Sequence, residues 1–170
     1  MKEKMILASD IDESSKMRLN RFVARAGVAS RRKSDALIQD GVVQINGQTV
    51  DQPGHSVVAD RDRVAVNGQP VELPTGFEYV LLYKTRGSLV TRTDTHGRAT
   101  IYEGVSKLRA STIAVGRLDL DTNGVLLLMD AGELAFRLTP PRYQLDKFDE
   151  VVVAWRPAPQ RLAAVTRAPA

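Results

Sequence analysis

A group of polar residues lies between two apolar segments in the second half of the chain. The apolar segments are Thr112–Val115 (TIAV) and Val125–Met129 (VLLLM), and the residues between them include Arg117, Asp119 and Thr122. Two buried-strand patterns joined in this way hold side chains rigidly at a sheet edge, where functional residues are common. Arg117 and Asp119 form a charged pair inside the apolar run, beside Thr122, which favours a functional role. The alternative is an ordinary hairpin turn, because Asp, Thr, Asn and Gly are frequent turn residues.

Further strands and a helix around this segment are predicted to position it. Apolar residues at Tyr79–Tyr83 predict a strand before a turn at Lys84–Gly87. A helix is expected at Ala131–Leu138, because Asp130 and Glu133 have capping-box spacing and the prolines at 140 and 141 end it. Other patterns predict a strand at 88–93, a short helix near 101–108, and a loop and strand at 143–153.

Two short helices are predicted between residues 17 and 41. The first ends at Gly27, and its apolar face is formed by Leu19, Phe22, Val23 and Ala26. The second begins at the N-cap Ser30 and ends at Gly41, with apolar positions at Ala36, Leu37 and Ile38.

Basic side chains gather on these two helices. Residues 17–35 contain six basic side chains and one acidic side chain, Asp35. Arg31, Arg32 and Lys33 lie in the first turn of the second helix, where the helix dipole favours acidic residues instead. We therefore expect these cations to bind RNA, and the chain's net charge of +4 is compatible with such a partner. The alternative is a solvated helical surface.

Two hairpins are expected after the helices. Apolar runs flank Asn46-Gly47, which is a strong hairpin signal, and a similar unit recurs around Asn67-Gly68. Residues 69–76 contain two prolines and a glycine, and we interpret them as a linker. Residues 1–16 show no sustained periodicity, and we interpret them as a flexible tail.

The composition excludes several classes of site. Of the 170 residues, 43% are hydrophobic, which is enough for a core. The lack of cysteine excludes disulfides, thiolate metal sites and cysteine nucleophiles, and two distant histidines, His55 and His96, do not predict a zinc site. No apolar run is long enough to cross a bilayer, and the N-terminus lacks the apolar core of a signal peptide. We expect a soluble, cytoplasmic protein.

The central segment reads Gly116-Arg117-Leu118-Asp119, followed by Asp121-Thr122, Gly124 and Leu126-Leu127-Leu128. It resembles the catalytic motif of RNA pseudouridine synthases, in particular the branch that modifies ribosomal RNA. The similarity continues through 130–135, 137–139 and 141–143. The resemblance implies isomerisation of a uridine in ribosomal RNA, with Asp119 as the nucleophile and no metal or cofactor. The supporting site residues that it implies are Arg117, Leu118, Thr122, Gly124 and Lys147.

Residues 17–64 resemble a second known unit, the S4-type RNA-binding domain, whose two helices present basic residues to RNA. This implies that RNA contacts Arg18, Arg21, Arg31, Arg32 and Lys33. Together the two resemblances imply an α+β protein with two domains. A small two-helix plus hairpin RNA-binding domain (17–68) is followed, after the linker (69–76), by the first part of a mainly antiparallel-sheet synthase domain (77–170).

The chain departs from the synthase pattern near its end. It has Lys147-Phe148-Asp149-Glu150 where the family has Lys-x-Tyr-Glu, so Asp149 would take the position of the tyrosine that packs on the target base. Residues 154–170 contain three prolines, three arginines and no acids, and they do not resemble the family. Three interpretations stay open: an active synthase, a non-catalytic RNA-binding protein that retains a truncated or degenerate synthase domain, and a product that folds only in residues 17–70.

Overall fold

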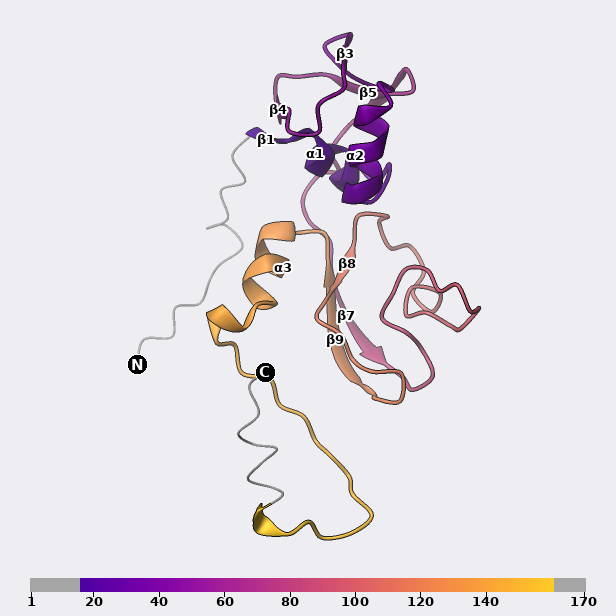
Figure 1. Ribbon diagram of the computed structural model, residues 1–170, viewed down its shortest axis with the longest axis vertical. Helices are drawn as coiled ribbons and strands as arrows, with labels where there is room; N and C mark the ends of the chain where they lie inside the picture. The colour runs from indigo at the N-terminus through magenta and orange to yellow at the C-terminus, as the bar shows by residue number, and fades with distance from the viewer. Residues whose placement is uncertain (1–15, 161–170) are drawn as a thin grey trace.

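The computed structural model describes residues 16–160 (Figure 1). It begins with strand β1 (Lys16–Arg18) and helices α1 (Leu19–Arg25) and α2 (Arg31–Gln39). Of the tail predicted at 1–16, residues 1–15 lie outside the described residues, and Lys16 pairs with Val58 as part of β1. Residues 161–170 of the unusual C-terminal stretch also lie outside them.

The two predicted helices form where their caps and apolar faces place them. In α1, Leu19, Phe22 and Val23 are buried. Gly27 follows this helix with φ +84°, a conformation that favours glycine. In α2, Ser30 Oγ accepts a hydrogen bond from the backbone N–H three residues later, so Ser30 is the N-cap that the sequence predicts.

The buried face of α2 differs from the prediction at one position. Ala36 is exposed, whereas Ser34 is fully buried beside the equally buried Ile38. The Ser34 hydroxyl donates a 3.0 Å hydrogen bond to the carbonyl oxygen of Ser30, which satisfies it in the core. A small polar residue therefore takes the inner position that apolar spacing assigned to alanine.

The two predicted Asn-Gly hairpins form and pair with each other in one four-stranded antiparallel sheet. The order is β3-β2-β5-β6, and the strands are β2 (Val43–Ile45), β3 (Gln48–Val50), β5 (Val64–Val66) and β6 (Gln69–Val71). Asn46 and Gly47 have φ values of 52° and 81°, and Asn67 and Gly68 have 51° and 74°. Positive φ at both central residues is the signature of a type I′ turn, which matches the twist of the flanking strands.

The first core lies between these helices and strands. Strand β4 (Ser56–Val58), which the sequence patterns did not predict, pairs with β1 and buries Val57 completely. The other buried residues of this core are Met17, Leu19, Phe22, Val23, Ile38, Val43, Ile45, Val64 and Val66. The expected linker starts later than residue 69, because 69–71 form β6. Pro70 is tolerated there because β6 is an edge strand.

A second antiparallel sheet has the order β7-β9-β8, with the strands β7 (Tyr79–Lys84), β8 (Ile113–Val115) and β9 (Gly124–Met129). The three apolar strands predicted here are thus confirmed. One face packs Leu126 and Leu128 against Ile101. On the other face, helix α3 (Gly132–Leu138) covers Met129, whereas Leu81 remains 72% exposed.

Three other predictions in this half are wrong. Residues 88–93 form a loop with one isolated bridge, from Leu89 to Thr100. Residues 101–108 form turns instead of a helix, because Gly104 and the positive φ of Lys107 (67°) interrupt it. Residues 144–153 form no strand, since within the described chain no strand lies beside them to accept their backbone hydrogen bonds.

Helix α3 begins without the predicted capping box. Its N-cap is Ala131, and no side chain caps it. The Asp130 carboxylate instead accepts a 2.7 Å hydrogen bond from the backbone N–H of Glu78 and pairs with Arg109 at 3.0 Å. Glu133 pairs with Arg21 of α1. Both carboxylates are therefore bound by residues from other parts of the chain and not by the N-terminus of α3. The helix still ends before Pro140, as expected, and the short 3₁₀ turn η2 (Pro141–Tyr143) follows it.

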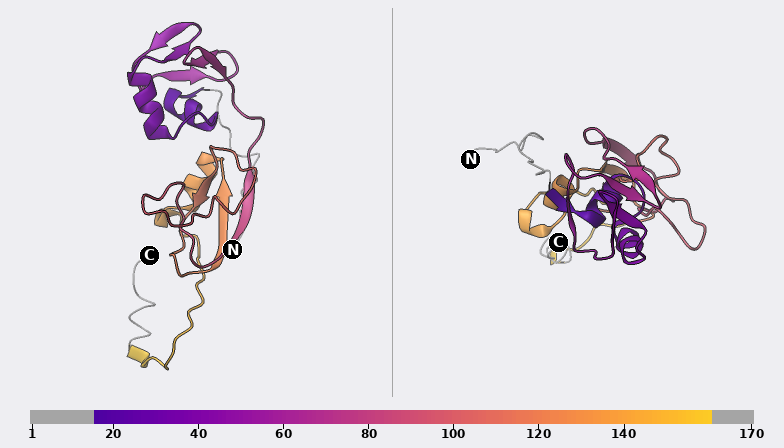
Figure 2. Two further views of the ribbon diagram at one scale, coloured as in Figure 1. Left: turned by 90° about the vertical axis from the view of Figure 1, so that its right-hand side faces the viewer. Right: turned by 90° about the horizontal axis from the view of Figure 1, so that it is seen from above.

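The four-stranded sheet lies at one end of the molecule, α1 and α2 lie between it and the second half, and α3 lies beside the sheet β7-β9-β8 (Figures 1 and 2). The chain after η2 extends away from both sheets (Figure 2). Within residues 16–160, no helix has both the length and the apolar character that crossing a membrane would require.

Candidate active site and nucleic-acid interface

Lys84 lies beneath the loop 116–123 that carries Asp119. It is the last residue of β7, and it is 1% exposed. Its Nζ donates hydrogen bonds to four main-chain oxygens, those of Asp119 (2.8 Å), Thr122 (2.8 Å), Thr85 (3.1 Å) and Leu120 (3.3 Å). A buried ammonium group is costly unless such acceptors surround it. The lysine and the loop backbone therefore stabilise each other.

Three more hydrogen bonds hold the same loop. The backbone N–H of Gly87 donates to the oxygen of Leu120 at 2.9 Å, and that of Thr122 donates to the oxygen of Asp119 at 3.1 Å. Asn123 Nδ2 donates to Tyr83 Oη at 2.6 Å. The side chain of Asp119 itself is exposed. The result is an accessible carboxylate on a fixed main chain, an arrangement suited to a reacting group.

Most predicted site residues share this loop, but not all expected contacts form. Arg117, Leu118 and Thr122 lie in the loop, and Gly124 follows it as the first residue of β9. Within residues 16–160, no ion pair or hydrogen bond joins the side chains of Arg117 and Asp119. Thr122 contacts Asp119 and Lys84 through its backbone N–H and C=O groups.

Lys147 stands apart from the other predicted residues. It is exposed in the segment that extends away after η2 (Figure 1). Within the described chain it makes no hydrogen bond or ion pair with loop 116–123. Its neighbour Phe148 is 93% exposed. The structure thus does not bring this end of the predicted motif onto the loop.

The predicted basic surface is present on α1 and α2. Arg31, Arg32 and Lys33 are exposed in the first turn of α2, which contains no acidic residue. Arg18 is exposed at the start of α1, and Arg21 is half-buried one turn later. The acid of this stretch, Asp35, accepts a 2.8 Å hydrogen bond from an asparagine of α1. Its charge is therefore turned toward α1 instead of the arginines of the first turn.

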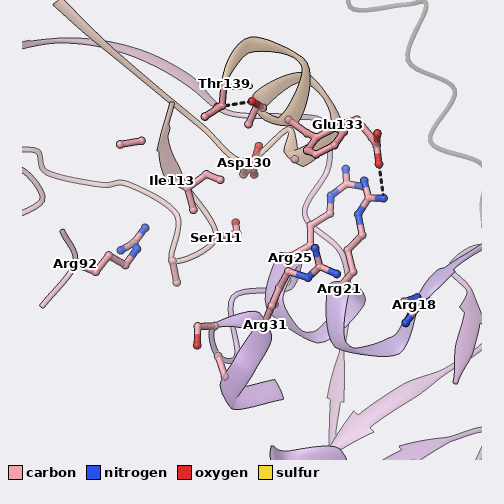
Figure 3. A pocket seen from close by; sticks show the side chains of 18 of the residues that line it. Arg18, Arg21, Arg25, Arg31, Arg92, Ser111, Ile113, Asp130, Glu133 and Thr139 are labelled. Carbon is pink, nitrogen blue, oxygen red and sulfur yellow. Dashed lines mark hydrogen bonds and ion pairs between the residues drawn. The ribbon is translucent and has the colours of Figure 1, made fainter. Parts of the chain in front are cut away.

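A cavity of about 890 Å³ lies between these helices and the second sheet (Figure 3). We call it the arginine cleft; its charged lining is Arg18, Arg21, Arg25, Arg31, Arg92, Asp130 and Glu133. Arg21 Nη1 and Glu133 Oε1 lie 2.9 Å apart, so one ion pair spans the cleft. The Arg25 guanidinium stacks on the ring of Phe77, 4.3 Å from its centre. Both contacts join the two halves of the molecule.

Both the basic surface and the Asp119 loop lie in parts of the chain that are similar to known proteins. Residues 17–62 match the S4 domain family. The chain is 42% identical over 130 residues to the ribosomal large subunit pseudouridine synthase B of Bacillus subtilis (strain 168), over 76% of this chain and 52% of that protein. The chain is homologous to RNA pseudouridine synthases. It is also 42% identical over 132 residues to an uncharacterized RNA pseudouridine synthase of Aquifex aeolicus, over 77% of this chain and 53% of that one.

This homologue of the synthases spans about half the length of the curated relatives that it matches. A crystal structure of a pseudouridylate synthase superposes on it with a TM-score of 0.40 and 27% identity, covering 75% of this chain and 54% of that one. The relationship rests on the sequence alignments. The S4 match contains α1 and α2, and so it contains the basic surface described above.

Sequence reasoning missed Lys84, Arg92 and Glu133. Lys84 was assigned to a turn, although the apolar run before it would have allowed a strand that ends on it. Glu133 was assigned to a helix cap, and Arg92 belonged to an expected strand. Arg92 in fact stacks on Tyr102 at 4.3 Å and donates to the main-chain oxygens of Arg109 and Thr112. No sequence signal marks these long-range contacts.

Proposed function

We propose that this chain binds structured RNA and isomerises a uridine of ribosomal RNA to pseudouridine, with Asp119 as the nucleophile. The observation that carries the proposal is the accessible Asp119 carboxylate on a loop that the buried Lys84 holds through main-chain oxygens. The homology to RNA pseudouridine synthases supports the assignment. The S4 domain supports RNA as the partner.

In this reaction the bond between ribose and uracil nitrogen breaks, the uracil turns, and a bond from ribose to a uracil carbon forms. The Asp119 carboxylate attacks either the ribose or the uracil ring, and this temporary bond breaks again before the product leaves. Carbon 5 of uracil loses its hydrogen as it bonds to the ribose, and the freed uracil nitrogen gains a proton. The uridine leaves the base stack first, which costs a few kcal/mol, and Arg117 fills the space that it vacates. The exposure of Arg117 in the loop leaves it accessible for that role. Gly124 allows close approach of RNA at the loop end, and Leu118 packs against it.

The basic side chains of α1 and α2 supply affinity through phosphates, and they do so without reading sequence. The residues assigned to this role are Arg18, Arg21, Arg31, Arg32 and Lys33. Lys147 is assigned to the support of the site, which requires the segment after η2 to approach loop 116–123 when RNA binds. The localisation that fits this substrate is the cytoplasm.

The test uses ribosomal RNA transcripts that carry tritium at carbon 5 of uridine, because isomerisation releases that hydrogen. The variant Asp119→Asn keeps the shape of the side chain and removes its charge, so tritium release should fall to background while RNA affinity stays nearly constant. Asp121→Asn is the matched control, since it changes another exposed acid of the same loop. Turnover in Asp119→Asn would remove the nucleophile assignment. RNA binding without any release by the unaltered chain would favour the non-catalytic interpretation.

A further inference from the structure

The ion pair between Arg21 and Glu133 joins the two walls of the arginine cleft. Arg21 of α1 and Glu133 of α3 lie 112 residues apart in the chain and 2.9 Å apart in space. Their side chains are 27% and 44% exposed, so water reaches the pair. Exposed ion pairs of this kind are weak and easily exchanged. The carboxylate of Glu133 is therefore a replaceable partner for Arg21.

The far wall of the cleft contributes a preorganised cation. Arg92 comes from the loop between β7 and β8, and Figure 3 shows it across the cavity from Arg21, Arg25 and Arg31. Its guanidinium stacks on Tyr102 and uses one nitrogen, Nη2, to donate to two main-chain oxygens. A guanidinium has five N–H donors, so further donors stay available to an anion. The side chain of Arg92 is exposed, so the contacts that hold it do not contribute to a hydrophobic core.

The cleft and Asp119 lie at opposite ends of β9. Loop 116–123 leads into Gly124, whereas Asp130 in the cleft lining directly follows Met129. Five residue steps along a strand are roughly 17 Å. A ligand that touches both places must be a polymer several nucleotides long, and the part in the cleft is not the reacting uridine.

We propose that the arginine cleft binds the phosphate backbone of the RNA beside the target uridine, and that Glu133 holds Arg21 until a phosphate displaces it. The inference rests on the proposed RNA binding. A phosphate offers more acceptor oxygens and more charge than a carboxylate, and arginine binds it in a bidentate manner. Arg92 contacts the same backbone from the other wall. Glu133 is thus a built-in competitor that weakens binding of RNA.

The experiment measures binding of the whole chain to a fluorescent RNA hairpin with a uridine-containing loop, over a series of salt concentrations. Glu133→Gln should tighten binding by about two- to fivefold. The effect is this small because an exposed ion pair contributes little free energy, and RNA must break only that pair to reach Arg21. In an Arg21→Gln background the same substitution should have no effect, because the competitor has lost its target. Arg92→Gln should weaken binding and reduce the log–log salt slope by about 0.7–0.9. Glu72→Gln, an equal charge change at an exposed site outside the cleft, should leave binding unchanged.

Two results would overturn the inference alone. In the first, Glu133→Gln tightens binding equally with and without Arg21, which indicates general electrostatics. In the second, Arg92→Gln and Glu133→Gln are inert while neutralising Arg32 and Lys33, which do not line the cleft, weakens binding. Failure of the unaltered chain to bind the hairpin would remove the proposed function and this inference together. Thermal unfolding of each variant establishes that a loss of binding is not a loss of fold.

Discussion

The ammonium group of Lys84 donates a 2.8 Å hydrogen bond to the main-chain oxygen of Asp119, 35 residues further along the chain. The contact joins the end of β7 to the loop between β8 and β9. Because the lysine holds the main chain, the carboxylate of Asp119 stays accessible while its backbone is fixed. Positioning and reactivity are therefore assigned to two different residues.

Replacing Lys84 with methionine should damage both the fold and the reaction. The variant keeps the bulk of the side chain but leaves the carbonyl oxygen of Thr122 without its donor, whereas the oxygens of Asp119 and Leu120 each keep one backbone donor. A buried group that stays unsatisfied costs about 1–3 kcal/mol. We expect a lower free energy of unfolding in urea, followed by circular dichroism, and loss of tritium release with RNA affinity retained. Lys147→Met is the control, because an exposed lysine should change stability by no more than about 0.5 kcal/mol. Equal stability of the two variants would contradict the role of Lys84.

Neutralising the first turn of α2 should weaken RNA binding in a salt-dependent way. The variant replaces Arg31, Arg32 and Lys33 with glutamine, and each lost phosphate contact should reduce the log–log salt slope by about 0.7–0.9. Fluorescence anisotropy over a salt series measures both quantities. Arg61 and Arg63 are exposed outside the helices and serve as a control pair. If slope and affinity are unchanged in the first variant, the basic surface is merely solvated.

Hydrogen exchange should reveal two folded parts. β9 is bonded to β7 on one side and β8 on the other, and Leu126 and Leu128 are buried in it. We expect the amides of 126–128 to exchange slowly, as do those of the first core. The edge strand β7 should open sooner. Slow exchange confined to residues 17–70 would instead favour the interpretation that only the first half folds.

The hydrogen bonds that Asp94 makes within the loop 94–98 should be lost only at low pH. The Asp94 carboxylate accepts hydrogen bonds from the side chain and backbone of Arg98 and from the backbone of His96, and these lower the pKa of Asp94 from 3.8 to about 2. Since the folded pKa is the lower one, the loop contacts are complete above pH 3.8 and disappear as the pH falls through about 2. The amide resonance of Arg98 in an NMR titration should report this midpoint, and Asp94→Asn should abolish the transition. A midpoint near 4 would show that the contacts do not form in solution.

The sequence predicts best those features whose cause is local. Asn46-Gly47 specifies its own turn because both residues tolerate positive φ, and Ser30 caps the backbone three residues away. The alternating burial of β7 follows from the pleat of a strand. In each case the physical reason lies within a few residues of the pattern, so a single sequence is enough.

The misses at Lys84, Asp130 and Glu133 involve partners that are remote in the chain. A lysine at a strand end looks like a solvated charge, and nothing in its neighbourhood reveals that oxygens of residues 119 to 122 surround it. Asp130 and Glu133 have the spacing of a cap, but their carboxylates pair with Arg109 and Arg21 instead. The arginine cleft depends on such pairs and on packing between two halves, which local patterns do not encode.

The two Asn-Gly turns have a consequence for the chemical ageing of the protein. Deamidation starts when the backbone nitrogen of the glycine attacks the asparagine side chain. An asparagine whose side chain is held by hydrogen bonds therefore deamidates slowly. Asn46 is anchored at both ends, to Asp62 at 3.1 Å and to the backbone N–H of Arg63 at 2.9 Å, whereas within residues 16–160 the side chain of Asn67 makes no hydrogen bond. Peptide mapping of stored protein should find isoaspartate at 67 before 46. An old preparation would then differ from a fresh one at the β5–β6 hairpin, with a lower net charge, while the β2–β3 hairpin stays intact.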